Sequence, residues 1–284
     1  MISLSRPASL GDLVAMHGGT LDAGLDPATV VANVAASDAD VRCDLAPVLG
    51  DRGAARLSVR ALVLLVSEPV APRVAAGNRW VHPRAEEVLA HLLSHPPDLA
   101  CALAHDDRAD APDVPEDARI EPNVVLFPGV RIGRRVTIGA GSVVGRPGFR
   151  FVGDLRMPHR AGVVIADDVE IGALCTIDAG ILAPTTIGRQ TKLDAQVHVG
   201  HGVVIGARCR LAAQVGLAGS VVIEDDVWIG GQAGIADHCR IGRGARIAAK
   251  AGVIGDVPPG ETFAGYPAVA RSRWLRGHAR LYRR

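Results

Sequence analysis

The chain has 284 residues, enough for two modest domains or for one domain followed by an elongated module. Lys and Arg together number 31 against 30 for Asp and Glu, a balance that argues against a nucleic-acid-binding protein held by phosphate contacts. Hydrophobic residues make up 48% of the chain, which excludes wholesale disorder. Because aromatic residues supply only 3%, we expect a core of Val, Ile, Leu and Ala.

The N-terminal segment and the cysteines indicate in which cellular compartment the protein is expected. MISLSRPASLGDLVAMHGG holds no basic stretch followed by a long apolar run, and no run of about 18 apolar residues occurs anywhere in the chain. We therefore expect neither a secretory signal nor a membrane span. Five cysteines lack CxxC pairing and zinc spacing, which predicts reduced packing thiols in a cytoplasmic protein and no metal site. They are Cys43, Cys101, Cys175, Cys209 and Cys239.

Residues 1–104 are predicted to form a small α/β domain. In chain order we expect a helix over 9–19, a strand over 28–36, a buried strand over 60–70, and an amphipathic helix over 82–95 with Pro at its second position. The acidic, Pro-bearing segment 105–118 (HDDRADAPDVPEDA) has the composition of a linker.

From Ile120 onward an aliphatic residue returns at every sixth position, with two interruptions. A period of six fits neither a 3.6-residue helix nor an alternating strand. It predicts a prism-shaped parallel β-solenoid over 119–263, in which each hexad gives a short strand and a tight turn. The two insertions are expected to leave the stack as surface loops, and a C-terminal helix is predicted over 264–284. The recurring residues are Ile120, Leu126, Ile132, Ile138, Val144; Ile165, Ile171, Ile177; and Ile187, Leu193, Val199, Ile205, Leu211, Leu217, Ile223, Ile229, Ile235, Ile241, Ile247, Val253.

These hexads resemble the hexapeptide repeats of the left-handed β-helix acyltransferases. Longer segments resemble the UDP-3-O-acylglucosamine N-acyltransferase family: IADDVEIGALCTIDAGIL is similar to its TIDRG segment, LDAQVHVGHGVVIG to its catalytic-histidine coil, and GFRF to its GFGF-like loop. The resemblance implies an α+β N-terminal domain followed by a left-handed parallel β-helix (hexapeptide repeat) and a C-terminal helix.

The same resemblance implies an activity and a set of site residues. The activity is transfer of an acyl group, expected to be 3-hydroxyacyl, from an acyl carrier protein thioester to the amine of an amino sugar such as UDP-3-O-acylglucosamine. His201 takes the place of the general base, for which imidazole is suited because it titrates near working pH. Asp194 is the candidate to orient it, and His238 is expected to position the acceptor or the acyl groups. The substrate-binding candidates are Phe149, Phe151, Gln196, Gly216 and Gly219.

The donor and the assembly follow from the family as well. No permanently bound cofactor is expected, and the phosphopantetheine arm of the donor enters with the substrate. Arg273, Arg276 and Arg280 lie in a C-terminal segment free of acidic residues, which suits docking of an acidic carrier protein. A solvated helix end is an equal interpretation of these cations. The family's cleft lies between subunits, so a homotrimer is expected.

Alternatives remain open from the sequence. Segment 45–57 lacks the aromatic residues on which the family stacks uracil, which favours a different amine or amino-sugar acceptor. An acyl-coenzyme A donor is a separate alternative. A coenzyme A-dependent sugar N-acetyltransferase is disfavoured because its N-terminal Gly fingerprint is absent. A γ-class carbonic anhydrase would bind zinc through three histidines, whose family spacing His198, His201 and His238 do not reproduce. A non-catalytic scaffold is the alternative outside the enzymes.

Overall fold

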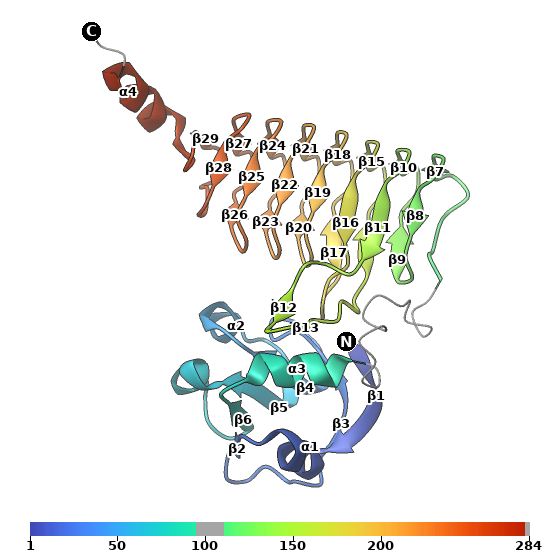
Figure 1. Cartoon of the computed structure of the whole chain (residues 1–284), viewed down its shortest axis with the longest axis vertical. Coiled ribbons are helices and arrows are strands. Elements are labelled where there is room, and N and C mark those ends of the chain that lie inside the picture. Colours follow the sequence, from blue (N-terminus) through green and yellow to red (C-terminus); the bar gives the residue numbers. More distant parts are fainter. Residues whose placement is uncertain (95–110, 282–284) are drawn as a thin grey trace. The chain divides into compact units, whose positions relative to one another are not determined.

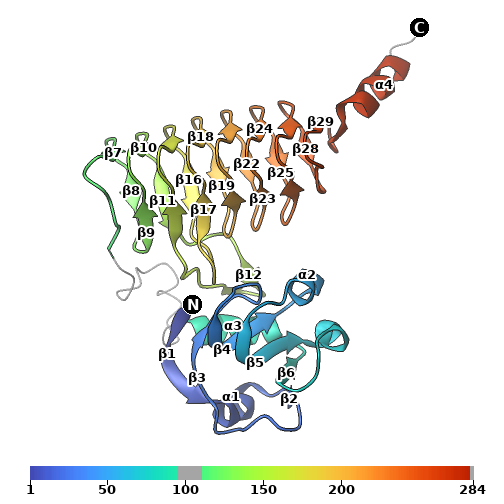
Figure 2. The same ribbon diagram turned by 180° about the vertical axis from the view of Figure 1, so that it is seen from behind.

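The computed structural model describes residues 1–94 and 111–281, which divide into two compact units (Figures 1 and 2). One unit is Met1–Ala104 with Arg150–Ala161, and the other is His105–Phe149 with Gly162–Arg284. Residues 105–110 of the predicted linker, Cys101 and the last three residues lie outside the described ranges.

The first unit is built on a six-stranded sheet with strand order β1-β3-β4-β5-β6-β2. Its centre from β3 to β6 is parallel, and β1 and β2 pair antiparallel at the two edges. The predicted helices and strands are confirmed as α1, β3, β5 and α3, and the sequence patterns missed the other elements. The elements are β1 Ile2–Ser9, α1 Leu10–His17, β2 Thr20–Leu21, β3 Val30–Val34, β4 Arg42–Val48, α2 Asp51–Ala55, β5 Arg60–Ser67, the 3-10 helix η1 Glu68–Arg73, β6 Arg79–His82, α3 Ala85–Leu93, β12 Phe151–Val152 and β13 Leu155–Arg156.

Local hydrogen bonds explain two features of this unit. The sequence of strand β4 does not alternate apolar and polar residues, because it contains Asp44. The Asp44 carboxylate accepts hydrogen bonds from the backbone N–H groups of Ala32 (2.9 Å) and Asn33 (3.1 Å) on β3. Trp80 is fully buried, and its indole N–H donates to the carbonyl of Gly18 at 2.9 Å. The Trp80 ring is therefore part of the core of this unit and is not available to stack on a base.

The second unit is a left-handed parallel β-helix with three flat faces, as the sequence predicted. Short strands at successive rungs pair in register along each face, and we number the faces in chain order. Face 1 contains β7 Arg119–Ile120, β10 Thr137–Ile138, β15 Glu170–Ile171, β18 Lys192–Leu193, β21 Arg210–Leu211, β24 Trp228–Ile229, β27 Arg246–Ile247 and β29 Thr262–Ala264. Face 2 contains β8 Val125–Leu126, β11 Val143–Arg146, β16 Thr176–Asp178, β19 His198–Val199, β22 Gly216–Leu217, β25 Gly234–Ile235 and β28 Gly252–Val253. Face 3 contains β9 Val130–Ile132, β14 Val163–Ile165, β17 Thr185–Ile187, β20 Val204–Ile205, β23 Val222–Ile223 and β26 Arg240–Ile241.

The residues that recur every six positions form the core of this β-helix. One continuous cluster of buried side chains runs from Val130 to Val257. The inward small residues include Cys175, Cys209 and Cys239, each at most 3% exposed, which confirms them as packing thiols. The core is thus one aliphatic column, and this accounts for the near absence of aromatic residues.

The corner between faces 1 and 2, here called corner 1–2, carries a ladder of glutamines. The side-chain amide of Gln214 donates to Gln196 at 2.7 Å, and that of Gln232 donates to Gln214 at 2.7 Å. All three have φ near +60°, which is uncommon for residues with a side chain. The conformation persists because each backbone N–H at this corner bonds the coil before it, as Gln214 does to Ala195 at 3.0 Å.

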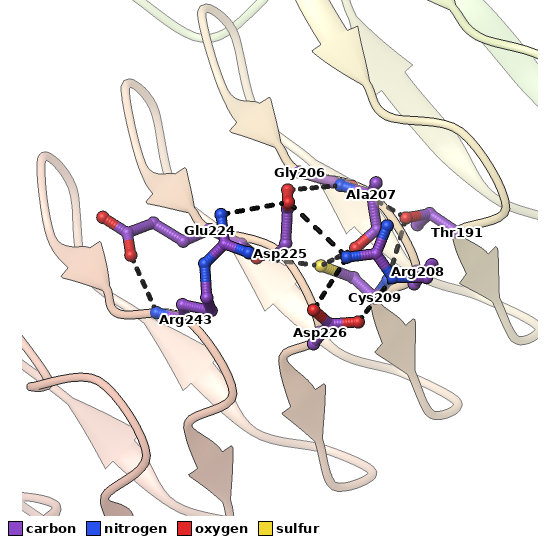
Figure 3. Close-up of polar contacts among 9 residues, drawn as sticks. All are labelled: Thr191, Gly206, Ala207, Arg208, Cys209, Glu224, Asp225, Asp226 and Arg243. Atoms are coloured by element: carbon purple, nitrogen blue, oxygen red, sulfur yellow. Dashed lines mark hydrogen bonds and ion pairs between the residues drawn. The ribbon is translucent and has the colours of Figure 1, made fainter.

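The corner between faces 3 and 1, corner 3–1, is held by ion pairs (Figure 3). Arg208 lies between Asp226 (2.6 Å) and Asp225 (3.6 Å), and Arg243 reaches Asp225 at 3.3 Å. Glu224 accepts the backbone N–H of Arg243 at 2.8 Å. These carboxylates are therefore occupied by guanidinium groups of neighbouring coils, and the cluster stabilises the stack of turns.

The corner between faces 2 and 3, corner 2–3, is where both insertions leave the solenoid. The first follows β11 and precedes β14, and the second joins β16 to β17. From the first, residues Arg150–Ala161 belong to the other unit, where the hairpin β12–β13 contacts α3. There Arg150 pairs with Glu86, and the guanidinium of Arg160 donates to the carbonyl of Leu93 at 3.1 Å.

The predicted C-terminal helix is α4, Arg271–Leu281. It begins later than position 264 because β29 first pairs antiparallel with β30, Val269–Ala270. None of the helices in the described ranges is long and apolar enough to cross a bilayer.

Candidate active site

Face 2 bears a hollow of about 590 Å³ that contains the predicted base. It runs along strands β19, β22, β25 and β28, with corner 2–3 as one edge. Its lining combines two histidines, a carboxylate, several glycines and two exposed aromatic rings. The lining residues are Phe149, Asp178, His198, Gly200, His201, Gly216, Leu217, Ala218, Gly219, Gly234, Ile235, Ala236, Gly252, Val253, Ile254 and Tyr266.

The imidazole of His201 lies directly over Gly219 of the next coil. A Cβ atom added at Gly219 would stand 2.5 Å from Nε2 and 2.6 Å from Cε1 of the ring, so only glycine leaves room for it. On either side, Ala218 and Ser220 donate their backbone N–H groups to neighbouring coils. Among the described residues no acceptor lies on the N–H of Gly219, which leaves this donor beside the imidazole for a ligand.

Three glycines form the floor of the hollow. Gly216, Gly234 and Gly252 pair in register after His198, one rung apart, and each occupies an outward position of its strand. At about 4.8 Å per rung the floor extends roughly 14 Å from His198. The ring of Tyr266 lies on Gly252 and ends the bare floor there. A narrow, flexible chain could therefore lie along the face without meeting a side chain.

A polar cluster stands at the opposite end of the floor. Asp178 is almost completely buried and pairs with Arg146, Nε to Oδ1, at 3.0 Å. Nδ1 of His198 lies 2.7 Å from the hydroxyl of Thr176, and its Nε2 lies 3.9 Å from Oδ2 of Asp178. Burial, and then the charge of Arg146, lower the pKa of His198 below 6.5, so its ring is neutral near pH 7. The cluster presents a neutral imidazole and a carboxylate that both suit hydroxyl groups.

The structure brings some of the predicted site residues together. His201, Gly216, Gly219 and Phe149 line this one hollow. His238 is on the same corner two coils further along; its N–H bonds the carbonyl of Gly219 at 3.0 Å, but its side chain is exposed and outside the lining.

Three other predicted residues lie elsewhere in the molecule. Asp194 follows β18 on corner 1–2 and lines a hollow on face 1, so the prediction that it orients His201 does not match the geometry of the chain. Its carboxylate accepts the N–H of Ala195 at 2.7 Å, as a turn residue does. Gln196 belongs to the glutamine ladder. Phe151 belongs to the first unit, where the guanidinium of Arg156 covers its ring at 4.5 Å.

The predicted carrier-docking arginines lie on α4. Arg273, Arg276 and Arg280 are exposed and recur at three and four residues, which places them on one side of the helix. The helix has no acidic residue in its first turn and no buried residue.

Sequence reasoning missed the polar cluster around Asp178. The sequence indicated only that His198 does not fit the zinc-binding spacing of a γ-class carbonic anhydrase, whereas its ring lines the hollow. The signal was available: Thr176 and His198 occupy the same outward position of successive face 2 strands, 22 residues apart. The second insertion changes the 18-residue spacing to 22, which hid the pairing. In the described ranges no three His, Cys, Asp or Glu side chains are grouped closely enough to hold a metal ion.

Comparison with known proteins agrees with this architecture. The family described as "Bacterial transferase hexapeptide (six repeats)" matches residues 113–146, 184–219 and 220–255. A crystal structure of a UDP-N-acetylglucosamine acyltransferase from Bacteroides fragilis is similar with a TM-score of 0.50 at 18% identity, covering 87% of this chain and 73% of that one. At this identity the likeness concerns the fold alone.

Several curated relatives named UDP-3-O-acylglucosamine N-acyltransferase match the sequence. The relative from Rhizobium meliloti is 46% identical over 164 residues and that from Caulobacter sp. strain K31 36% over 157, covering 58% and 54% of this chain. These two matches span only 44% and 46% of the relatives' own length. The relative from Methylobacterium sp. strain 4-46 is 35% identical over 328 aligned positions, covering 98% of this chain and 93% of the relative. With that coverage, the chain belongs to the UDP-3-O-acylglucosamine N-acyltransferase family.

Proposed function

We propose that the protein transfers an acyl group, expected to be 3-hydroxyacyl, from an acyl carrier protein thioester to the amine of UDP-3-O-acylglucosamine. The observation that carries the proposal is the imidazole of His201 beside a free backbone N–H, above a groove floored by glycine. The names of the relatives supply the acceptor. The geometry supplies the base, the donor for an oxyanion and the space for a thioester arm.

The chemistry needs one base and one oxyanion donor. The neutral amine of the acceptor attacks the thioester carbonyl, and His201 removes the proton from nitrogen as the C–N bond forms. The carbonyl oxygen acquires negative charge, which the N–H of Gly219 stabilises. When the C–S bond breaks, the imidazolium returns its proton to the thiolate, leaving an amide and a free carrier thiol. No covalent acyl-enzyme is needed.

The polar cluster is suited to hold the acceptor sugar. Asp178 accepts hydrogen bonds from hydroxyl groups, and its geometry is fixed by Arg146. His198, neutral at pH 7, offers one ring nitrogen to the hollow while Thr176 holds the other. Asp178 and His198 line the same hollow as His201, so a sugar held there brings its amino group towards the base.

The glycine floor is suited to the thioester arm. Gly216, Gly234 and Gly252 leave a bare strip on which the phosphopantetheine arm or acyl chain of the donor lies, with Tyr266 at its far end. The strip leads along the solenoid axis in the direction of α4. The exposed cations Arg273 and Arg276 on that helix complement an acidic carrier protein.

We place the enzyme in the cytoplasm as a homotrimer with no permanently bound cofactor. The four described cysteines are free and buried, in keeping with a reducing compartment. The trimer is supported by the one-sided form of the hollow, which is open to solvent along face 2 of a single chain.

The test is direct. Purified protein is incubated with UDP-3-O-acylglucosamine and a panel of 3-hydroxyacyl carrier proteins, and products are identified by mass spectrometry. We expect a diacylated sugar nucleotide and at least a 100-fold loss of kcat with His201→Ala, in the range of general-base contributions. Unchanged product formation by His201→Ala would exclude the proposed base. Equal use of acyl-coenzyme A, or product from another amine alone, would refute the assigned donor or acceptor.

A further inference from the structure

The turn that carries His201 is held by a buried hydroxyl group. Thr185 begins strand β17, directly after the second insertion, and its side chain is completely buried. Its Oγ1 accepts the backbone N–H of Gly202, the residue that follows His201, at 2.9 Å. The proposed chemistry gives Thr185 no role, although this contact lies one residue from the base.

The next two coils have a backbone carbonyl in the place of this hydroxyl. Gly202, Ser220 and His238 recur every 18 residues on corner 2–3 and share a φ near +60°. The N–H of Ser220 donates to the carbonyl of His201 at 2.8 Å, and that of His238 donates to the carbonyl of Gly219 at 3.0 Å. Within the described residues no backbone carbonyl accepts the N–H of Gly202, so a side chain of the preceding coil replaces the usual acceptor.

The second insertion accounts for this replacement. Strand β17 pairs with β20 so that Thr186 is the partner of Val204, and in this register the carbonyl of Ala183 would accept the N–H of Gly202. Residues 181–183 form a bend, and the Ala183 carbonyl is directed at Gly180, where an added Cβ would stand only 1.8 Å from its oxygen. The ladder of backbone bonds is therefore interrupted at the turn that carries the base, and a hydroxyl group restores it.

The backbone around His201 needs this bond because it is intrinsically free. His201 stands between Gly200 and Gly202, and glycine restricts the backbone least of all residues. The N–H of Gly200 (2.9 Å) and the carbonyl of His201 (2.8 Å) both bond the following coil. Thr185 supplies the bond to the preceding coil, so the turn is tied on both sides and keeps one orientation.

We propose that Thr185 is a positioning residue for the acyl transfer, which holds the imidazole of His201 over Gly219 by fixing the turn 200–202 from the preceding coil. The inference rests on the proposed function for the reaction that it serves. Thr185 is buried and does not line the hollow, so it acts through the backbone of the turn and not on a substrate. A released turn moves the base relative to the oxyanion donor, and a displacement of about 1 Å at a reacting group costs on the order of 100-fold in rate.

Thr191 provides a matched control in the same β-helix (Figure 3). It is also completely buried, and its Oγ1 accepts the backbone N–H of Cys209 at 3.0 Å and donates to the carbonyl of Gly206 at 2.9 Å. It does not line the hollow on face 2. Valine in place of either threonine keeps the branched shape and removes one buried hydroxyl group, so the two variants lose comparable stability but release different turns.

The first test is steady-state kinetics with a 3-hydroxyacyl carrier protein and UDP-3-O-acylglucosamine. We expect Thr185→Val to lower kcat about tenfold with the KM of both substrates unchanged, because the substrate contacts are intact while the base is misplaced. Thr185→Ser restores the hydroxyl group and should recover wild-type kcat, and Thr191→Val should retain it. The melting temperatures of the two valine variants should fall alike, by roughly 2–4 °C for one lost hydrogen bond. Wild-type kcat in a folded Thr185→Val protein, an equal loss of kcat in Thr191→Val, or no recovery with Thr185→Ser would overturn the proposal.

The second test does not depend on activity. Amide hydrogen exchange of the peptide that contains Gly202, followed by mass spectrometry, should be faster in Thr185→Val and unchanged in Thr185→Ser, because only the valine variant leaves this N–H without its acceptor. Equal exchange in wild type and Thr185→Val would overturn the proposal. If the wild-type protein forms no product, the proposed function fails, while the exchange rates still decide whether Thr185 holds the turn. Should Thr185→Val not fold, Thr185→Cys, whose thiol is a weak acceptor, is measured against the same outcomes.

Discussion

Gly219→Ala is the sharpest test of how His201 is positioned. The φ of Gly219 is outside the left-handed region, so alanine is tolerated by the backbone. Its Cβ, however, would stand 2.5 Å from Nε2 of His201, about 0.9 Å inside the 3.4 Å at which ordinary contact begins. The coil below is fixed by its ladder, so the imidazole must move by roughly that distance.

A displacement of about 1 Å at a reacting group costs on the order of 100-fold in rate. We therefore expect kcat/KM of Gly219→Ala to fall about 100-fold, equivalent to about 2.7 kcal/mol of transition-state stabilisation. Thermal stability should change by less than about 1 kcal/mol, because the ring is half-exposed and free to swing outward. The assay is steady-state transfer from the acylated carrier, followed by mass spectrometry of the sugar product.

Gly255→Ala is the matched control. It lies on the same corner, has no positive φ, and nothing stands within 4 Å of an added Cβ, so activity and melting temperature should stay at wild-type values. In a double-mutant cycle with His201→Ala, Gly219→Ala should cause no further loss, because its effect passes through the imidazole. Wild-type kcat/KM in a folded Gly219→Ala protein would refute the reasoning.

Three other predictions concern titration and stability. Arg146→Gln removes a charge that lowers the pKa of His198, so we expect that pKa to rise in an NMR titration of the imidazole Cε1–H; an unchanged value would contradict the assignment. Asp22→Asn removes the carboxylate that pairs with Arg79 at 2.9 Å, so we expect a lower urea midpoint of unfolding; an unchanged midpoint would mean that water already screens the pair. Burial lowers the pKa of His17, and the charges of His91 and His82 lower it further. The stability that His17 contributes is therefore present above pH 6.5 and is lost as pH falls towards the lowered pKa. His91→Gln should weaken this acid sensitivity in thermal melts at pH 5, and an identical pH profile would count against it.

The six-residue period predicted the β-helix because one physical requirement repeats in every hexad. Each short strand must place one large aliphatic residue inward, so Ile171, Ile177 and Ile187 could be assigned to the core without any structure. The packing role predicted for the Cys175 thiol is confirmed as well, because the side chain is buried in this core. In the first unit the pattern was weaker. Helix α3 was predicted by its periodicity, but β4 was missed because it contains the partly buried Asp44, which accepts a hydrogen bond from the neighbouring strand.

The sequence predicted only part of the candidate site, because this prediction also depended on regular spacing. Spacing along the chain gives the rung and corner of a residue as long as the coil length is constant, which placed His201 beside Gly219. The two insertions change the coil length, so spacing no longer gives the rung and corner of the residues around them. Hence Asp178 and His198, which they bring to one end of the hollow, were invisible to spacing, and the sequence offered Asp194 in their place.

By itself, the sequence determined the aliphatic prism, its turns and the histidine that the family places at the base position, because these depend on contacts between residues a fixed number of positions apart. Only the tertiary structure decided which side chains share a face. His201 and Asp194 are seven residues apart but sit at opposite edges of one strand, whereas His201 and Gly219 are eighteen apart and touch. The reason is geometric: in a coil of about eighteen residues, neighbours across the stack are closer than neighbours around the turn.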